Sequence, residues 1–208
     1  MRSSAGSSAV RDATRGTVAL VVAPRHHHYF DFADYLRVED DSDIKHEFAD
    51  GQVWAMSGGS PEHARIIANV AMLLNMALGS RRCAVFSSEL RIRVRSANRA
   101  TYPDASVICD RVELDPEDPR GHTALNPTLL VEVLSPSTAA YDQGEKLDYC
   151  KQIPSLQEVM LVHHDARLVV VWRRTGGSWI SFELTEVVEL RSIDCKLPVA
   201  DIYRDQLA

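Results

Sequence analysis

The sequence lacks an apolar run that could cross a membrane: the longest such stretch near its start, Val18–Ala23, is far shorter than the roughly 20 residues that a bilayer requires. That stretch is also too short, and follows Asp12 too closely, for a secretory signal peptide. Basic charge is not in excess either, because 23 basic residues stand against 29 acidic ones. This balance excludes a histone-like coating of positive charge, although an enzyme that acts on DNA needs only one basic cleft.

Cysteine is scarce as well. The four cysteines, Cys83, Cys109, Cys150 and Cys195, are far apart and include no C-x-x-C pair, which argues against a zinc knuckle. Cys83 and Cys109 lie in apolar, strand-like runs, where cysteine commonly serves as a small core residue. We therefore expect reduced thiols in the core of a cytoplasmic protein that has no membrane partner.

The remaining composition is that of a folded domain. Apolar residues make up 45% and charged residues 25% of the 208 residues, which suits a single globular unit. Residues 1–28 are rich in serine and show no hydrophobic periodicity, so we expect a flexible N-terminal tail there. Residues 29–208 are then expected to form the domain.

Local signals predict an α/β (mixed α+β) fold in which helices pack on a sheet. A short amphipathic helix over Phe32–Glu39 is followed by strands over 45–48 and 52–56, which Asp50-Gly51 would join in a hairpin. Ser60-Pro61 is a typical helix start, and that helix should end near Leu78. A further helix is expected over 141–150, a loop over 110–127, and strands over 83–86, 90–95, 105–109, 129–134, 157–163, 168–173 and 179–184.

The helix that ends near Leu78 has a wide apolar stripe. Ile66, Leu73 and Ala77 extend the stripe beyond the single face that the usual spacing of three and four residues produces. A helix of this kind is buried on two sides, either in a thick core or at a subunit contact. A homodimer is therefore one of two explanations that remain open.

The strongest local charge feature is a row of arginines. Arg91, Arg93 and Arg95 alternate with Ile92 and Val94, so on a strand the three guanidinium groups would share one face. Their spacing of about 6.6–7 Å resembles the separation of successive phosphates along a nucleic acid. The three arginines are therefore candidate DNA-binding residues, although a solvated strand face is the more common explanation for such a row.

Three carboxylates stand in unusual places. Asp104 directly follows Pro103 at the start of a strand, and Glu47 lies in the first hairpin. Glu132 interrupts the otherwise apolar strand 129–134, where a charge is costly unless it is paired or bound to a metal. For any one of the three, an ion-paired structural role is the more common case. Together they indicate a site for a hard cation such as Mg²⁺.

Lys146 is a candidate partner for these carboxylates. It lies on the expected helix over 141–150, four residues after Asp142 and on the same face. Near a metal site, a lysine can hold an attacking water or neutralise charge that builds up on a phosphate. Two other features carry less weight: His163-His164-Asp165 fits a strand that turns into a hairpin, and His63 fits a helix start.

Several ordered blocks of the sequence resemble the bacterial Uma-two family, whose members are restriction-endonuclease-like proteins of the PD-(D/E)XK nuclease superfamily. The similarity extends from about Tyr29 to Tyr203. The blocks are Lys45–Gly51, Met56–His63, Tyr102-Pro103-Asp104, Val131–Thr138, Tyr141–Lys146 and Ile153–Glu158.

The resemblance implies a central mixed β-sheet flanked by helices and a Mg²⁺-dependent site for phosphodiester hydrolysis. By position, Asp104 corresponds to the Pro-Asp aspartate, Glu132 to the second acidic ligand, and Glu47 to the acidic residue from the N-terminal region. The superfamily lysine should stand two residues after Glu132, but Leu134 occupies that position. In this family the lysine of the following helix, here Lys146, is expected to replace it.

Two hypotheses follow. In the first, Asp104, Glu132 and Glu47 bind Mg²⁺, with Mn²⁺ as a second candidate ion, and the protein hydrolyses DNA with the help of Lys146. In the second, the absent lysine at position 134 and the acidic net charge reflect a catalytically inactive nuclease fold that binds DNA or protein. Binding of Mg²⁺ discriminates between them, because an inert module has no need of the ion.

Overall fold

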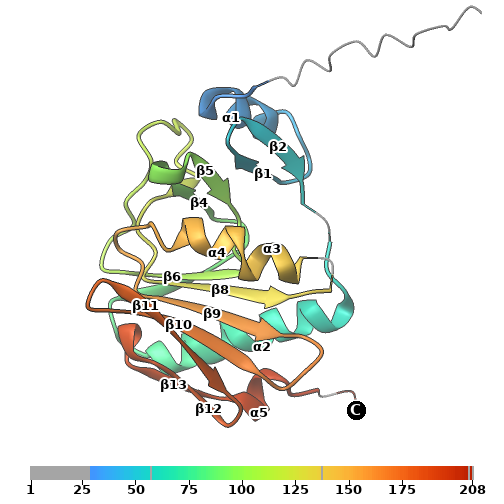
Figure 1. The fold of residues 1–208 in the computed structure, drawn as a ribbon, viewed down its shortest axis with the longest axis vertical. Coiled ribbons are helices and arrows are strands. Elements are labelled where there is room, and N and C mark those ends of the chain that lie inside the picture. The colour runs from blue at the N-terminus through green and yellow to red at the C-terminus, as the bar shows by residue number, and fades with distance from the viewer. Residues whose placement is uncertain (1–28, 57, 137, 206, 208) are drawn as a thin grey trace, which may run out of the picture.

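The computed structural model describes residues 29–56, 58–136, 138–205 and 207, so the tail expected over 1–28 lies outside the described residues. A six-stranded mixed sheet forms the centre of the domain (Figure 1). Its neighbours pair antiparallel except β8 and β9, which run parallel. In spatial order the strands are β11 (Ser178–Leu184), β10 (Val169–Thr175), β9 (Glu158–His163), β8 (Leu129–Leu134), β6 (Ala105–Cys109) and β3 (Cys83–Ser87).

A second sheet of five short strands lies beside the first one (Figure 1). It contains the expected hairpin and β4, and two strands that the sequence did not reveal: β5, and β7 inside the expected loop over 110–127. The spatial order is β2 (Gln52–Ala55), β1 (His46–Ala49), β5 (Arg99–Thr101), β4 (Arg91–Val94) and β7 (Thr123–Ala124).

Helix α2 (Pro61–Leu78) covers one face of the six-stranded sheet. The Ser60 side chain accepts a hydrogen bond from the His63 N–H, and Pro61 occupies the first turn, as the sequence predicts. Ile66, Val70 and Leu74 are buried against alternate residues of β6 and β8, and against β13 (Cys195–Pro198) and α5 (Val199–Ile202). The thick core thus accounts for the wide apolar stripe, and β12 (Val187–Leu190) completes this layer by pairing with β13.

Helices α3 (Ala139–Gln143) and α4 (Glu145–Cys150) lie between the two sheets (Figure 1). The single helix expected over 141–150 is thus divided at Gly144, where an added Cβ would come 2.8 Å from the carbonyl oxygen of Ala140. Leu147 packs in a core formed with Leu130 of β8 and Ile92 of β4. Residues from both sheets therefore reach the same short helix.

Helix α1 (Phe32–Asp40) packs on the face of the five-stranded sheet that is turned away from α4. Asp31 caps it by accepting a hydrogen bond from the Asp34 N–H. Phe32 and Tyr35 are buried against Phe48 of β1. This small core covers the sheet face to which Arg91 and Arg93 point.

Cys83 and Cys109 form a disulfide, so the expectation of reduced thiols at these two positions is wrong. They stand opposite one another in the β3–β6 pair. Opposite side chains of an antiparallel pair have Cβ atoms only about 4.5–5.5 Å apart, a proximity that the 26-residue sequence separation hides. Cys150 and Cys195 are free and buried.

Within the described residues, no helix is sufficiently long and apolar to span a membrane.

Candidate functional site

A cavity of about 490 Å³ opens where the end of β8 meets the start of α2 and the hairpin β1–β2. Its lining brings together all four residues that the sequence analysis selected as catalytic candidates: Glu47, Asp104, Glu132 and Lys146. The cavity is also lined by Gly59, His63, Tyr102, Val133, Asp142 and His164.

Lys146 is the centre of a buried charge cluster. Its Nζ lies 2.9 Å from Glu132 Oε1, 3.2 Å from Glu47 Oε1 and 3.5 Å from Asp142 Oδ1. Glu132 comes from β8 and Glu47 from β1, so α4 presents one ammonium group to a carboxylate from each sheet. The hydroxyl of Thr101 also donates a hydrogen bond to Glu47 Oε1. These side chains are all buried.

Burial dominates the electrostatics of the cluster. It raises the pKa of Glu132 well above the usual value for a glutamate, and the charges of Asp104 and Asp142 raise it further against the opposing effect of Lys146. Burial alone would lower the pKa of Lys146, but the charges of Glu132 and Glu47 outweigh it and hold that pKa well above its ordinary value. The lysine is therefore a stable cation among an excess of carboxylates.

Asp104 lies at the edge of this cluster and is oriented by the backbone of β8. Its Oδ2 accepts a hydrogen bond of 2.7 Å from the Val133 N–H. His63 Nε2 lies 3.5 Å from the same oxygen and 2.8 Å from the Val133 carbonyl oxygen, to which it donates in its Nε2–H form. Interaction with Asp104 raises the pKa of His63.

The position of the His63 ring leaves room only for a glycine at position 59. A Cβ at Gly59 would come 2.5 Å from His63 Nδ1, so a side chain there would displace the ring. His63 lies in the first turn of α2, after the Ser60 cap, as the sequence predicts. Its contact with Asp104 was missed, because the two residues are far apart in the sequence.

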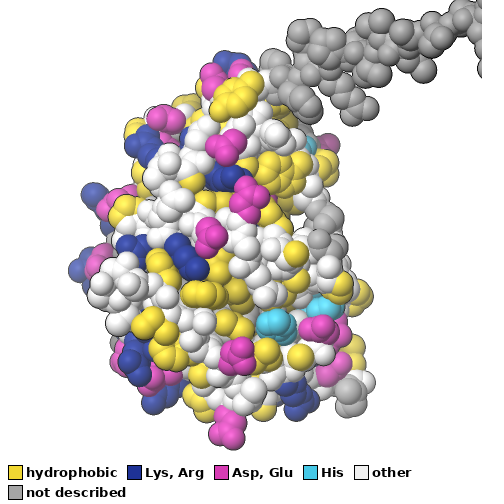
Figure 2. Space-filling view, viewed as in Figure 1, with side chains coloured by type: hydrophobic (Ala, Val, Ile, Leu, Met, Phe, Trp, Pro, Cys, Tyr) yellow, Lys and Arg dark blue, Asp and Glu magenta, His cyan; other side chains and the backbone are white. Residues whose placement is uncertain are grey.

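His164 is a second histidine of the cavity that sequence reasoning missed. Strand β9 ends at His163 and turns toward β10, as the sequence predicts, and His164 then reaches the cavity wall. The parallel pairing of β8 and β9 brings the ends of these strands to the same edge of the sheet. Figure 2 shows histidine side chains gathered beside acidic ones over the β9–β10 end of this face.

The donor set fits a hard cation only in part. In the described portion of the chain, no three acidic, histidine or cysteine side chains form a ready-made metal group. Glu132 Oε1 is buried, and its polar neighbour is the Lys146 ammonium at 2.9 Å. Mg²⁺ commonly uses one or two carboxylates and completes its shell with waters and substrate phosphate. Asp104 and Glu132, which line the same cavity, meet that requirement.

The expected solvent-facing row of arginines is wrong. Arg91 and Arg93 are only 4% and 6% exposed. The Arg91 guanidinium packs on the rings of Tyr35 and Tyr102, and the Arg93 guanidinium lies 4.0 Å from the centre of the Phe32 ring. Alternation does place the two arginines on one sheet face, but α1 covers that face.

Arg95 departs from the row for another reason. Strand β4 ends at Val94, and Arg95 begins a 3₁₀ turn over Arg95–Ala97. Its Nη2 lies 2.9 Å from Asp115 Oδ1 and 3.2 Å from Glu117 Oε1. The three arginines therefore do not form a continuous surface along which a DNA backbone could lie.

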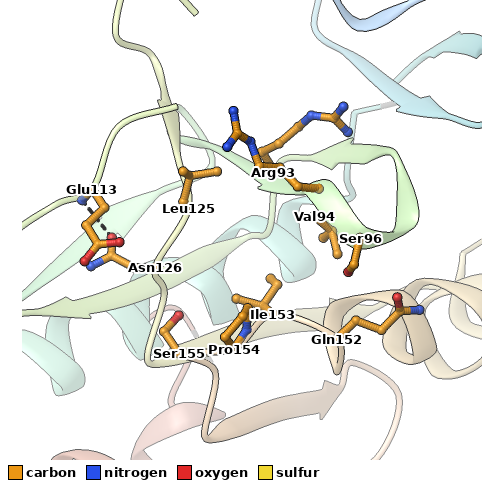
Figure 3. A pocket seen from close by; sticks show the side chains of 11 residues that line it. Arg93, Val94, Ser96, Glu113, Leu125, Asn126, Gln152, Ile153, Pro154 and Ser155 are labelled. Carbon is orange, nitrogen blue, oxygen red and sulfur yellow. Dashed lines mark hydrogen bonds between the residues drawn. The ribbon is translucent and has the colours of Figure 1, made fainter. Parts of the chain in front are cut away.

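A separate hollow of about 280 Å³ lies between the end of β4 and the loop that precedes β9 (Figure 3). Apolar side chains, including Leu125 and Ile153, supply much of its wall. Asn126 Oδ1 accepts a hydrogen bond of 2.8 Å from the Glu113 N–H, and Asn126 Nδ2 donates one of 2.9 Å to the Arg111 carbonyl oxygen. These bonds are structural, and the hollow offers nothing comparable to the carboxylate cluster.

Comparison with known proteins identifies the family. The family model described as "Putative restriction endonuclease" matches residues 32–200. The chain belongs to the Uma2 family. Two relatives come from Synechocystis. "Uncharacterized protein slr1290" is 35% identical over 175 residues, which cover 82% of this chain and 90% of the relative. "Uncharacterized protein sll1609" is 31% identical over 153 residues, which cover 73% of this chain and 85% of the relative.

A solved structure supports the fold of this Uma2 protein. It is the crystal structure of "a putative nuclease belonging to DUF820" from Anabaena variabilis, which matches with a TM-score of 0.67 at 19% identity. The match covers 82% of this chain and 96% of that structure. The expected central mixed sheet with flanking helices is confirmed, and family and fold together support a nuclease-like function.

Proposed function

We propose that this Uma2 protein is a Mg²⁺-dependent endonuclease that hydrolyses phosphodiester bonds in DNA. The observation that carries the proposal is the convergence of Lys146 with Glu132 and Glu47, next to Asp104, in one cavity. The family description supports DNA as the substrate. The donor set of Asp104 and Glu132 supports Mg²⁺, with Mn²⁺ as the second candidate.

The position of Leu134 fits this proposal. Leu130, Glu132 and Leu134 alternate along β8 on the face that is turned to α4, and Leu134 is buried in the core there. Lys146 approaches the same face from α4 and reaches Glu132 without a lysine on the strand. A cation beside the second carboxylate is thus retained, although it comes from a different element.

Each residue then has a separate task. Asp104 and Glu132, with the help of Glu47, would hold the metal ion. The ion would acidify a water and stabilise negative charge on the phosphate. The Val133 N–H fixes the orientation of Asp104. The Lys146 ammonium keeps Glu132 and Glu47 close together and provides positive charge beside the phosphate.

The proposal is tested by plasmid nicking with Mg²⁺, Mn²⁺ or EDTA. We expect cutting by the wild type in Mg²⁺ and none in EDTA. We expect a loss of at least about 100-fold in Asp104→Asn and Glu132→Gln, because each replaces a carboxylate ligand of the proposed metal site by a neutral amide. Asp110→Asn is the matched control, since Asp110 is exposed outside the cavity, where it faces Arg82.

Normal cutting by Asp104→Asn would refute the assignment of the site. Absence of cutting by a folded wild-type protein that also fails to bind Mg²⁺ would favour the alternative, a nuclease fold that binds DNA or protein without catalysis.

A further inference from the structure

A second buried polar cluster lies behind β1 as seen from the candidate site, and it shares one residue, Tyr102, with the cavity lining. Its centre is Glu39 in the last turn of α1, whose side chain is only 5% exposed. Glu39 Oε1 accepts a hydrogen bond of 2.8 Å from the His46 N–H and lies 2.9 Å from His46 Nδ1. Its Oε2 accepts a hydrogen bond from the Tyr102 hydroxyl and lies 3.5 Å from Arg91 Nη2.

The two residues that Glu39 holds stand next to candidate site residues in the sequence. His46 directly precedes Glu47, and Tyr102 stands two residues before Asp104. Since neighbouring side chains of a strand point to opposite faces, His46 faces α1 while Glu47 faces Lys146. One carboxylate in α1 therefore joins the two chain segments that bring Glu47 and Asp104 to the cavity.

Other contacts of the cluster restrain the same segments. The Tyr35 hydroxyl donates a hydrogen bond of 2.7 Å to the His46 carbonyl oxygen, so α1 holds both backbone groups of His46. Arg91 Nε donates a hydrogen bond of 2.9 Å to the Tyr102 hydroxyl. Buried charge is costly to retain, and well-packed apolar side chains often give equal or greater stability. Stability alone therefore does not explain why these charged side chains are buried here.

We propose that Glu39 is a positioning residue of the site: it fixes β1 and the segment Tyr102–Asp104 relative to each other, and thereby sets the separation of Glu47 and Asp104 across the cavity. This inference rests on the proposed function. Groups that orient metal ligands typically change metal affinity by about 10–100-fold when they are removed. Glu39 would act in this way although it does not line the cavity.

The test is calorimetric titration of the full chain with Mg²⁺, in the wild type, Glu39→Gln and Asp40→Asn. Glu39→Gln should weaken Mg²⁺ binding by about 10-fold or more, because an amide cannot accept from both His46 and Tyr102 as the carboxylate does. Asp40→Asn is the matched control: it removes the same charge from the adjacent, partly exposed position of α1, where Asp40 faces Arg120 at 3.1 Å. We expect its Mg²⁺ affinity to equal that of the wild type.

Tyr102→Phe is the second variant, and it decides the question if Glu39→Gln does not fold. It keeps the buried ring and removes only the hydroxyl that Glu39 binds. We expect weaker Mg²⁺ binding than in the wild type. Urea denaturation in EDTA is run in parallel, since a purely structural role would lower the urea midpoint and leave the Mg²⁺ affinity of the folded protein unchanged.

The outcomes separate the two proposals. Wild-type affinity in both Glu39→Gln and Tyr102→Phe would overturn the positioning role while the nuclease proposal stands. Both proposals are overturned if the folded wild type binds no Mg²⁺. They are also overturned if the Mg²⁺ affinity of Asp104→Asn equals that of the wild type.

Discussion

Replacing Lys146 by methionine should strongly destabilise the protein. The substitution keeps most of the side-chain volume but removes an ammonium that lies within 2.9–3.5 Å of Glu132, Glu47 and Asp142. Removing one partner from a buried ion pair costs about 3–5 kcal/mol, because the other charge is left uncompensated. We expect a loss of this size at about pH 7, which is a large part of the roughly 5–15 kcal/mol by which a typical domain is stable.

The loss should depend on pH in a defined direction. Burial already raises the pKa of Glu132 in the folded protein, and the loss of Lys146 removes the charge that opposes this shift. A carboxyl group whose pKa is higher in the folded state binds more protons there, so the free energy of unfolding falls as the pH rises from about 4.5 toward the folded pKa. Lys146→Met should therefore be closer to the wild type at about pH 5 than at about pH 8.

Urea denaturation in EDTA, followed by tryptophan fluorescence, measures this effect, since the chain has three tryptophans. Lys196→Met is the control, because Lys196 is exposed and its partner Glu189 is only partly buried. We expect its urea midpoint to stay near that of the wild type. A wild-type midpoint for Lys146→Met at pH 7, or a deficit that grows as the pH falls, would refute the electrostatic reasoning.

Two further predictions concern other parts of the fold. Cys83→Ser opens a disulfide that spans 26 residues, and the entropy of the freed loop predicts a loss of about 3.5 kcal/mol in the free energy of unfolding; reductant should lower the wild type to the level of the variant, and an unchanged wild type would contradict the prediction. Hydrogen bonds and the charge of Arg91 outweigh burial and hold the pKa of Asp118 below its usual value of 3.8. Asp118 therefore stabilises the fold above about pH 4 and ceases to do so as the pH falls through the folded pKa. Acid titrations of urea midpoints should show the deficit of Asp118→Asn vanishing there, and a constant deficit would be the contrary result.

Strong local patterns predicted the main elements well. The apolar runs over 105–109 and 129–134 became β6 and β8 with the expected bounds, and Ser60 and Pro61 start α2. The strands β5 and β7 escaped prediction because they have three and two residues, which are too few for alternation to be recognised. Predicting the disulfide would have required knowing that Cys83 and Cys109 stand opposite each other in β3 and β6. The register between two strands that are distant in the sequence cannot be read from either strand alone.

In the candidate site too, local patterns predicted some features, whereas contacts between distant segments were missed. The cost of a charge inside an apolar strand was sufficient to expect a partner for Glu132, and Lys146 is that partner. The arginine row was misjudged because alternation tells which side chains share a face but not what covers it. Arg91 and Arg93 are covered by α1, more than 50 residues earlier in the chain. Glu39 was missed for the same reason, since its partners meet only in the folded protein.

The alternation along β8 also limits how the gene can change. Leu129, Val131 and Val133 face the core under α2, whereas Leu130, Glu132 and Leu134 face α4. A slip of one residue would exchange the two sets. An insertion or deletion of a single codon within this strand would thus carry Glu132 into the α2 core and place a valine beside Lys146. Point substitutions at the apolar positions would be far better tolerated, so length variation among relatives should be excluded from this strand and be found in the loops.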